Sequence, residues 1–198
     1  GVGAGPVPRP GLPAEGAPGY VHRSRGALPP TPKAMHSEML PVIIQGGMGV
    51  GISSWMLAQA VASRGQLGVV AGAAVDTSLV RLLNDGDPGG HYRRALAAFP
   101  MQEYVEEVLG RFFRPDGRGG EPYAPLKMFS MTLDRERARL LALANFAEVY
   151  LAREGHSGSV GINLLTKIQF PNLPSLYGAM LAGVNYVLMG AGIPRDIP

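Results

Sequence analysis

Short apolar runs alternate with longer segments of helical periodicity over residues 39–198. The apolar runs each end at a glycine or a polar residue, and they predict β-strands at residues 42–44, 66–71, 159–165 and 185–189. Apolar positions that repeat with the helical period predict helices at residues 53–62, 78–83, 91–114 (broken at Pro100), 134–153 and 173–182. Strands that alternate with helices are typical of parallel β/α units, so the sequence predicts an α/β fold.

The first predicted strand ends in a loop with four glycines, Gln45-Gly46-Gly47-Met48-Gly49-Val50-Gly51. A backbone without side chains can approach a ligand closely, and the amides at a helix N-terminus favour negative charge. The loop precedes a predicted helix with a serine cap, so it is a candidate for binding a phosphorylated or flat ligand. Its spacing does not fit a Rossmann fingerprint, and no lysine follows Gly51 as a P-loop requires. The alternative is a tight turn that binds nothing.

The N-terminal segment has the composition of a disordered chain. Residues 1–33 contain seven glycines and eight prolines but few large apolar side chains. Such a segment cannot bury enough apolar surface to offset the entropy of ordering itself. We therefore expect residues 1–38 to form a disordered, weakly basic tail. A solvated tail is the simpler interpretation, and an arm that binds a partner is the alternative.

The overall composition narrows the class of protein. With 198 residues, 46% of them hydrophobic, the chain can form one domain with a sizeable core. The net charge of +3 is scattered, so we expect no nucleic-acid partner. No apolar run approaches the ~20 residues of a membrane span, and we expect neither a membrane partner nor a signal peptide. The absence of cysteine excludes disulfides, thiolate metal sites and a cysteine nucleophile, and it fits a cytoplasmic location.

Two amide side chains stand where a ligand could meet them. Asn163 lies inside an otherwise apolar predicted strand, where its amide could hydrogen-bond a heterocycle across the strand ends. The alternative is a buried asparagine bonded to neighbouring backbone. Gln45, at the end of the first predicted strand, has the same two interpretations, and Asp76 is interpreted as a helix cap. No histidine has a metal-ligand or catalytic partner at a suitable spacing; the four are His22, His36, His91 and His156.

Several of these segments together resemble the nitronate monooxygenases, formerly called 2-nitropropane dioxygenases. They are PVIIQGGMG at residues 41–49, GQLGVVAG at 65–72, GINLL at 161–165 and GVNYVLMGAGIP at 183–194. That family consists of FMN-dependent (β/α)8 TIM barrels and is related to flavin-containing enoyl reductases. The resemblance covers about residues 40–75 and 158–198. It implies that the chain is the N-terminal part of a TIM barrel.

The resemblance also implies how the chain would bind its cofactor. Gly46, Gly47 and Met48 match the first-strand loop that packs on the flavin, and Asn163 matches the strand asparagine that hydrogen-bonds the flavin ring system. Gln45 completes the set of expected FMN-binding residues. The implied reaction is the oxidation of a nitronate by FMN, after which the reduced flavin reacts with oxygen. The flavin does the redox work, and the protein positions and tunes it.

Two features depart from that family. Residues 84–157 form a longer, helical connection than the simplest members carry, and we interpret them as a helical insertion. The chain also ends after four predicted strands, whereas a TIM barrel typically needs ~250 residues. The family's catalytic histidine would follow the fourth strand, and its phosphate-binding glycine loops would follow the seventh and eighth. We therefore expect residues 39–198 to be an incomplete FMN-binding domain, and we assign no catalytic residue.

Two alternatives to the nitronate monooxygenase remain open. One is an FMN-dependent enoyl reductase of fatty-acid or polyketide synthesis, which would take an enoyl thioester and NADPH. The other is a non-catalytic, truncated half-barrel. A half-barrel exposes strand edges and an uncovered interior face, so we also expect self-association. Without the phosphate-binding loops, we expect the 198-residue chain to retain flavin weakly or not at all.

Overall fold

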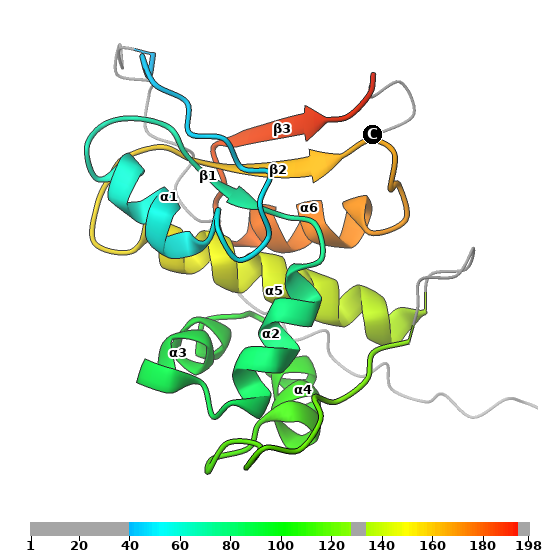
Figure 1. Cartoon of the computed structure of the whole chain (residues 1–198). Helices are drawn as coiled ribbons and strands as arrows, with labels where there is room; N and C mark the ends of the chain where they lie inside the picture. Colours follow the sequence, from blue (N-terminus) through cyan, green and yellow to red (C-terminus); the bar gives the residue numbers. More distant parts are fainter. Residues whose placement is uncertain (1–39, 128–133, 194–198) are drawn as a thin grey trace, which may run out of the picture. The chain divides into compact units, whose positions relative to one another are not determined.

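The computed structural model describes residues 40–127 and 134–193, so the predicted disordered tail of residues 1–38 lies outside the described residues. Three parallel strands form one sheet, in the order β1 (Gly68–Ala71), β2 (Val160–Leu165) and β3 (Tyr186–Gly190). The predicted α/β fold with a parallel sheet is confirmed. Strands that are neighbours in sequence are also neighbours in space, and the sheet they form is open (Figure 1). Its closure into a TIM barrel stays a prediction.

The first predicted strand is only partly formed. Its one bridge pairs Ile44 with Leu67, just before β1. Two glutamine side chains extend this pairing, because the amide of Ile43 donates to Oε1 of Gln66 at 2.8 Å and the amide of Val69 donates to Oε1 of Gln45 at 2.9 Å. The two side-chain oxygens thus add to the backbone bonds of the bridge, which the amide of Leu67 donates to Ile43 and the amide of Gln45 donates to Leu67. The segment therefore follows the edge of β1 without becoming a regular strand.

Three helices cover one face of the sheet, as Figure 1 shows: α1 (Trp55–Ala62), α5 (Arg135–Arg153) and α6 (Asn172–Leu181). Val70, Ile162 and Leu164 of the strands belong to the hydrophobic core on this side. Helix α5 is the central element of that core, since twelve of its nineteen residues are buried. Other elements must therefore pack against α5 as well, because the sheet covers only one of its sides.

The remaining helices cover the side of α5 that faces away from the sheet (Figure 1). They are α2 (Val75–Asn84), α3 (His91–Ala97) and α4 (Gln102–Phe112), with a short 3-10 helix η1 (Pro88–Gly90) between the first two. Residues 84–157, which the sequence predicts as a helical insertion, thus contain helices of two kinds. Helices α3 and α4 lie outside the sheet layer, whereas α5 packs directly on the sheet as the crossover helix between β1 and β2.

Glycine permits two close contacts between elements. Gly68 of β1 lies against the carbonyl oxygen of Ala58 in α1, and Gly178 of α6 lies against the carbonyl oxygen of Ala142 in α5. A Cβ at either glycine would overlap that oxygen. These two glycines therefore allow α1 to approach the sheet, and α6 to approach α5, more closely than any other residue would.

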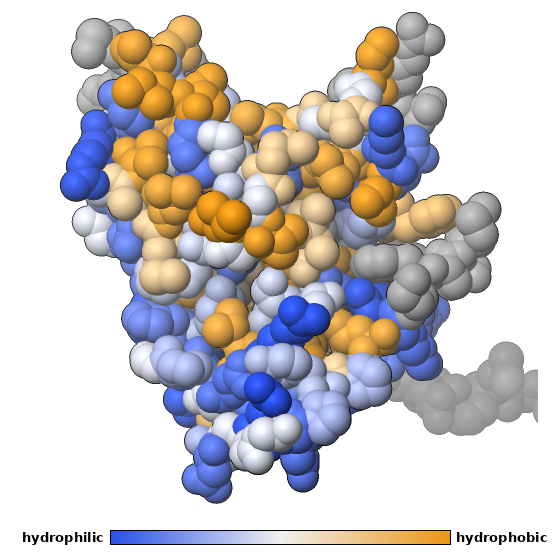
Figure 2. Space-filling model, viewed as in Figure 1, coloured by the Kyte–Doolittle hydropathy of each residue, from blue (hydrophilic) through white to orange (hydrophobic). Residues whose placement is uncertain are grey.

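Exposed apolar side chains gather around the sheet rather than around the outer helices. Figure 2 shows hydrophobic residues over the upper half of the view, where the sheet lies, and mostly hydrophilic ones over α2 to α4. The large apolar residues exposed in segment 40–52 and in β3 are Leu40, Val42, Ile43, Ile44, Met48, Val50, Ile52, Tyr186 and Val187. Among the helices of the described ranges, none is long and apolar enough to cross a membrane.

Candidate functional site

The carboxyl ends of the strands bring the glycine loop and the predicted strand asparagine together. Gly47 is buried against Val69 of β1 and Asn163 of β2, and a Cβ on Gly47 would lie 2.9 Å from the Cβ of Asn163. A Cβ on Gly190, at the end of β3, would lie 3.3 Å from Sδ of Met48 and 3.6 Å from Oδ1 of Asn163. Three of the residues expected to bind FMN are therefore neighbours, although they come from distant parts of the sequence.

Asn163 lies on the face of the sheet that the helices do not cover. Its neighbours in the strand, Ile162 and Leu164, belong to the helix-covered core, and side chains alternate between the faces of a strand. The backbone oxygen of Asn163 accepts from the amide of Gly72 at 2.8 Å. Within residues 40–127 and 134–193, however, its half-buried side-chain amide has no hydrogen-bond partner. This geometry favours a ligand-facing asparagine over one bonded to neighbouring backbone.

Gln45 and Gly46 hold the loop in place instead of presenting free groups. Besides accepting from Val69, the Gln45 amide donates through Nε2 to the carbonyl oxygen of Gly46 at 2.6 Å. The same oxygen accepts from Oγ of Ser53 at 2.8 Å. Both ends of the Gln45 amide are thus engaged within the chain. That these two residues bind FMN stays a prediction, while the observed contacts fix the path of the loop.

The helix that follows the glycine loop is capped by a residue from another helix. Ser54 is the N-cap residue of α1, so the predicted position of the serine is confirmed, but its hydroxyl makes no capping hydrogen bond. Instead, the amide of Trp55 donates to Oε2 of Glu148 in α5 at 2.8 Å. The other oxygen, Oε1, accepts from the hydroxyl of Tyr92 in α3 at 2.6 Å. Glu148 therefore ties the start of α1, and with it the end of the glycine loop, to α3 and α5.

Burial is the largest cause of the pKa shifts of Glu148 and Tyr92. Desolvation raises the pKa of Glu148 above its usual 4.5, while the hydrogen bonds from Tyr92 and Trp55 act in the opposite direction. Burial also raises the pKa of Tyr92 above its usual range, and the charge of Glu148 adds to that shift. The Tyr92 hydroxyl consequently stays protonated and remains a donor to Glu148.

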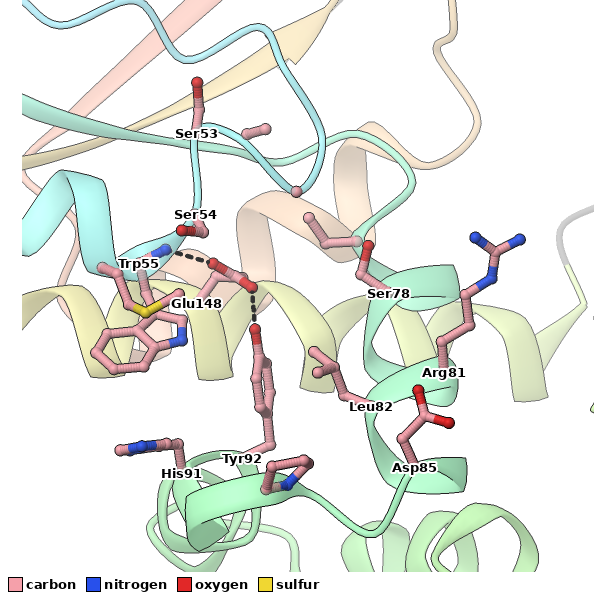
Figure 3. Close-up of a pocket in the computed structure, with 15 residues that line it drawn as sticks. Ser53, Ser54, Trp55, Ser78, Arg81, Leu82, Asp85, His91, Tyr92 and Glu148 are labelled. Atoms are coloured by element: carbon pink, nitrogen blue, oxygen red, sulfur yellow. Dashed lines mark hydrogen bonds between the residues drawn. The ribbon is translucent and has the colours of Figure 1, made fainter. Parts of the chain in front are cut away.

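A cavity of about 510 Å³ lies beside this cluster, bordered by α1, α2, α3 and α5 (Figure 3). Trp55, Tyr92 and Glu148 border one side of it, and Ser78, Arg81 and Leu82 of α2 border the other. Ser53 and Ala71 also line it, so the cavity begins at the carboxyl end of β1. Its volume lies within the range of ~300–1,000 Å³ that is typical of small-molecule sites.

Other residues considered from the sequence have structural partners. Asp76 is fully buried in the first turn of α2, where its Oδ1 accepts from the amide of Thr77 at 2.9 Å. The N-cap residue is Ala74, which corrects the predicted position of the cap. Oδ2 of Asp76 lies 2.6 Å from Nε of Arg137 in α5, an ion pair whose atoms are not aligned as a hydrogen bond. The ring of His156 bonds the carbonyl oxygen of Ala152 at 2.7 Å. Within the described ranges, no three histidine or acidic side chains gather so that they could hold a metal ion.

Sequence reasoning missed Glu148 and the cavity beside it. The available signal is a lone acid inside the apolar run of residues 140–152 in a helix, since a charge there needs a buried partner. Comparison with protein-family models finds no match for the chain, and neither a curated protein nor a solved structure matches it.

Proposed function

We propose that this chain acts in an FMN-dependent oxidation of alkyl nitronates with oxygen, as the nitronate monooxygenases that it resembles do. The observation that carries the proposal is the unbonded amide of Asn163 beside the buried Gly47. Both residues lie at the carboxyl ends of parallel strands, where α/β folds of this kind place their ligands. The consecutive order of β1, β2 and β3 is compatible with a TIM barrel, which is the architecture we propose.

The side chains at the strand ends fit a flavin ring. Gly47 packs on the sheet through the side on which other residues carry a Cβ, which leaves its backbone free to face a flat ligand. Met48 exposes a polarizable thioether that can lie on an aromatic ring. Asn163 offers both a donor and an acceptor to the polar edge of the ring. Bound FMN would supply the electron transfer, while these residues would bind and orient the ring.

Titration with flavins tests the proposed ring site. Riboflavin and FMN are each added to the 198-residue chain, and quenching of flavin fluorescence gives the dissociation constants. Loss of a hydrogen-bonding amide should weaken both ligands about fivefold to tenfold in Asn163→Ala. Gln169→Ala removes an exposed amide beyond the end of β2 and serves as the matched control. We expect the wild type to bind both flavins weakly, because the phosphate-binding loops are missing. Equal affinities in the two variants would contradict the proposal.

The substrate is tested separately from flavin binding. With flavin bound, an alkyl nitronate should reduce it under anaerobic conditions, and oxygen should reoxidise it. Reduction by NADPH followed by conversion of an enoyl thioester would instead support the enoyl reductase alternative. Flavin binding without either reaction would support the non-catalytic half-barrel.

A further inference from the structure

The cavity between α1, α2, α3 and α5 combines an apolar wall with a few polar groups. Trp55, Val75 and Leu82 supply apolar surface, and Met56 and Pro88 extend it. The polar groups come from separate elements, namely Ser54 before α1, Ser78 and Arg81 in α2, and His91 in α3. A small number of polar groups in an apolar pocket is the usual composition of a site that orients a small molecule.

The acidic groups at the cavity are already neutralised or bonded. Glu148 accepts from Trp55 and Tyr92, as described above. Asp85 accepts from Nε of Arg118 at 3.0 Å and from the hydroxyl of Tyr123 at 2.9 Å. Neither carboxylate is therefore available to a cationic ligand without loss of its present contacts.

Three of the polar side chains at the cavity, Ser54, Ser78 and Arg81, make no hydrogen bond or ion pair within the described residues. Arg81 lies over the ring of Tyr123, 5.3 Å from its centroid, and forms no ion pair with any residue in the described ranges. The hydroxyls of Ser54 and Ser78 make no hydrogen bond there either. Ser78 and Arg81 are one helical turn apart in α2 and border the same cavity (Figure 3). The unused polar groups are thus hydrogen-bond donors with one positive charge.

We propose that this cavity binds a monocarboxylate with an unbranched apolar body, such as a medium-chain acyl acid. The carboxylate would bind Arg81 and Ser78, and the chain would lie against Trp55 and Leu82. The single guanidinium of Arg81 matches the one negative charge of a carboxylate, whereas a phosphate dianion carries a second negative charge that Arg81 alone does not match. The cavity is bordered by helices, while Asn163 lies on the uncovered face of the sheet, so the proposal does not depend on flavin binding.

The sole tryptophan of the chain lines this cavity and provides the assay. Octanoate is titrated into the 198-residue chain while the fluorescence of Trp55 is recorded, with octan-1-ol and inorganic phosphate as parallel probes. Arg81→Gln removes the proposed anchor, and Arg64→Gln is the matched control, an exposed arginine of the chain that does not line the cavity. Far-UV circular dichroism verifies that both variants fold, as expected for substitutions of exposed side chains.

We expect octanoate to change the Trp55 fluorescence saturably, and Arg81→Gln to raise its dissociation constant about tenfold or more. Arg64→Gln should leave the dissociation constant unchanged, and octan-1-ol should bind more weakly and without sensitivity to Arg81. Equal binding of octanoate and octan-1-ol, or equal effects of the two arginine substitutions, would overturn the proposal. Binding of phosphate as tight as that of octanoate would also overturn it and would indicate a general anion site.

Discussion

Two substitutions of Glu148 distinguish the contribution of its hydrogen bonds to stability from the contribution of its charge. Glu148→Ala leaves the buried amide of Trp55 and the hydroxyl of Tyr92 without their acceptor, 2.8 Å and 2.6 Å away in the wild type. Each unsatisfied donor costs about 1–3 kcal/mol, so the free energy of unfolding should fall by about 2–6 kcal/mol. Glu148→Gln keeps an acceptor for Trp55 and offers a donor to the oxygen of Tyr92. We expect it to cost less than about 1.5 kcal/mol.

The raised pKa of Glu148 adds a pH dependence to this comparison. The folded state holds the proton of Glu148 more tightly than the unfolded state, whose carboxyl has the usual pKa of 4.5. The resulting stabilisation is fully present below pH 4.5 and is lost as the pH rises through the folded pKa. The loss reaches at most about 1.4 kcal/mol per pH unit within that window. Glu148→Gln cannot titrate, so its stability relative to the wild type should rise with pH there.

Urea denaturation measures both effects. The unfolding of the wild type, Glu148→Gln and Glu148→Ala is followed by circular dichroism and Trp55 fluorescence at several pH values above and below 4.5. Taking the difference between wild type and Glu148→Gln cancels the titration of the other carboxyl groups. The reasoning is refuted if Glu148→Gln is as unstable as Glu148→Ala, or if that difference does not change with pH.

Three further substitutions test the packing around α5 by thermal and urea unfolding. Gly178→Ala should cost about 1–3 kcal/mol because its methyl group would overlap the carbonyl oxygen of Ala142, and an unchanged midpoint would show that α6 can move away freely. Gly110 lies inside α4 with open space around it, and alanine has the higher helix propensity, so Gly110→Ala should stabilise the protein by about 0.5–1 kcal/mol. A loss of stability would contradict this expectation. Asp76→Asn removes the charge of a fully buried carboxylate that lies 2.6 Å from Nε of Arg137, and it should cost about 3–5 kcal/mol. A cost below about 1 kcal/mol would mean that this ion pair contributes little.

Helices and strands that form because of residues within or next to them could be predicted from the sequence. The helix expected at residues 134–153 is α5, and Asp134 caps it by accepting from the amide of Glu136. The strand expected at residues 159–165 is β2, because a short apolar run next to a glycine-rich turn has few other conformations in a packed core. The segment at residues 42–44 differs, since it forms a single bridge that two glutamine side chains extend, and its apolar residues are exposed.

Only the part of the candidate site that lies at the strand ends could be predicted from the sequence, because the order of strands and helices determines its position. The resemblance assigned both the loop at Gly47 and the side chain of Asn163 to flavin binding. They lie next to each other because parallel strands align their carboxyl ends. The cap that Glu148 provides for α1 could not be predicted, because it depends on how α5 packs against a helix far away in the sequence. The cavity beside Arg81 was unpredictable for the same reason, since four helices border it.

Because α5 packs on α1 and β1, these two early elements can complete their packing only after translation has reached α5. Helix α1 and strand β1 are complete at Ala71, but the helix that covers them ends at Arg153. Contacts across so long a separation form slowly, because the intervening chain must first close into a loop. Until α5 leaves the ribosome, β1 is covered by α1 alone, and the apolar surface that α5 would bury is open to chaperones or aggregation. Nascent chains that stop before Arg135 should therefore be digested by protease around the glycine loop, whereas chains that include α5 should become protected there.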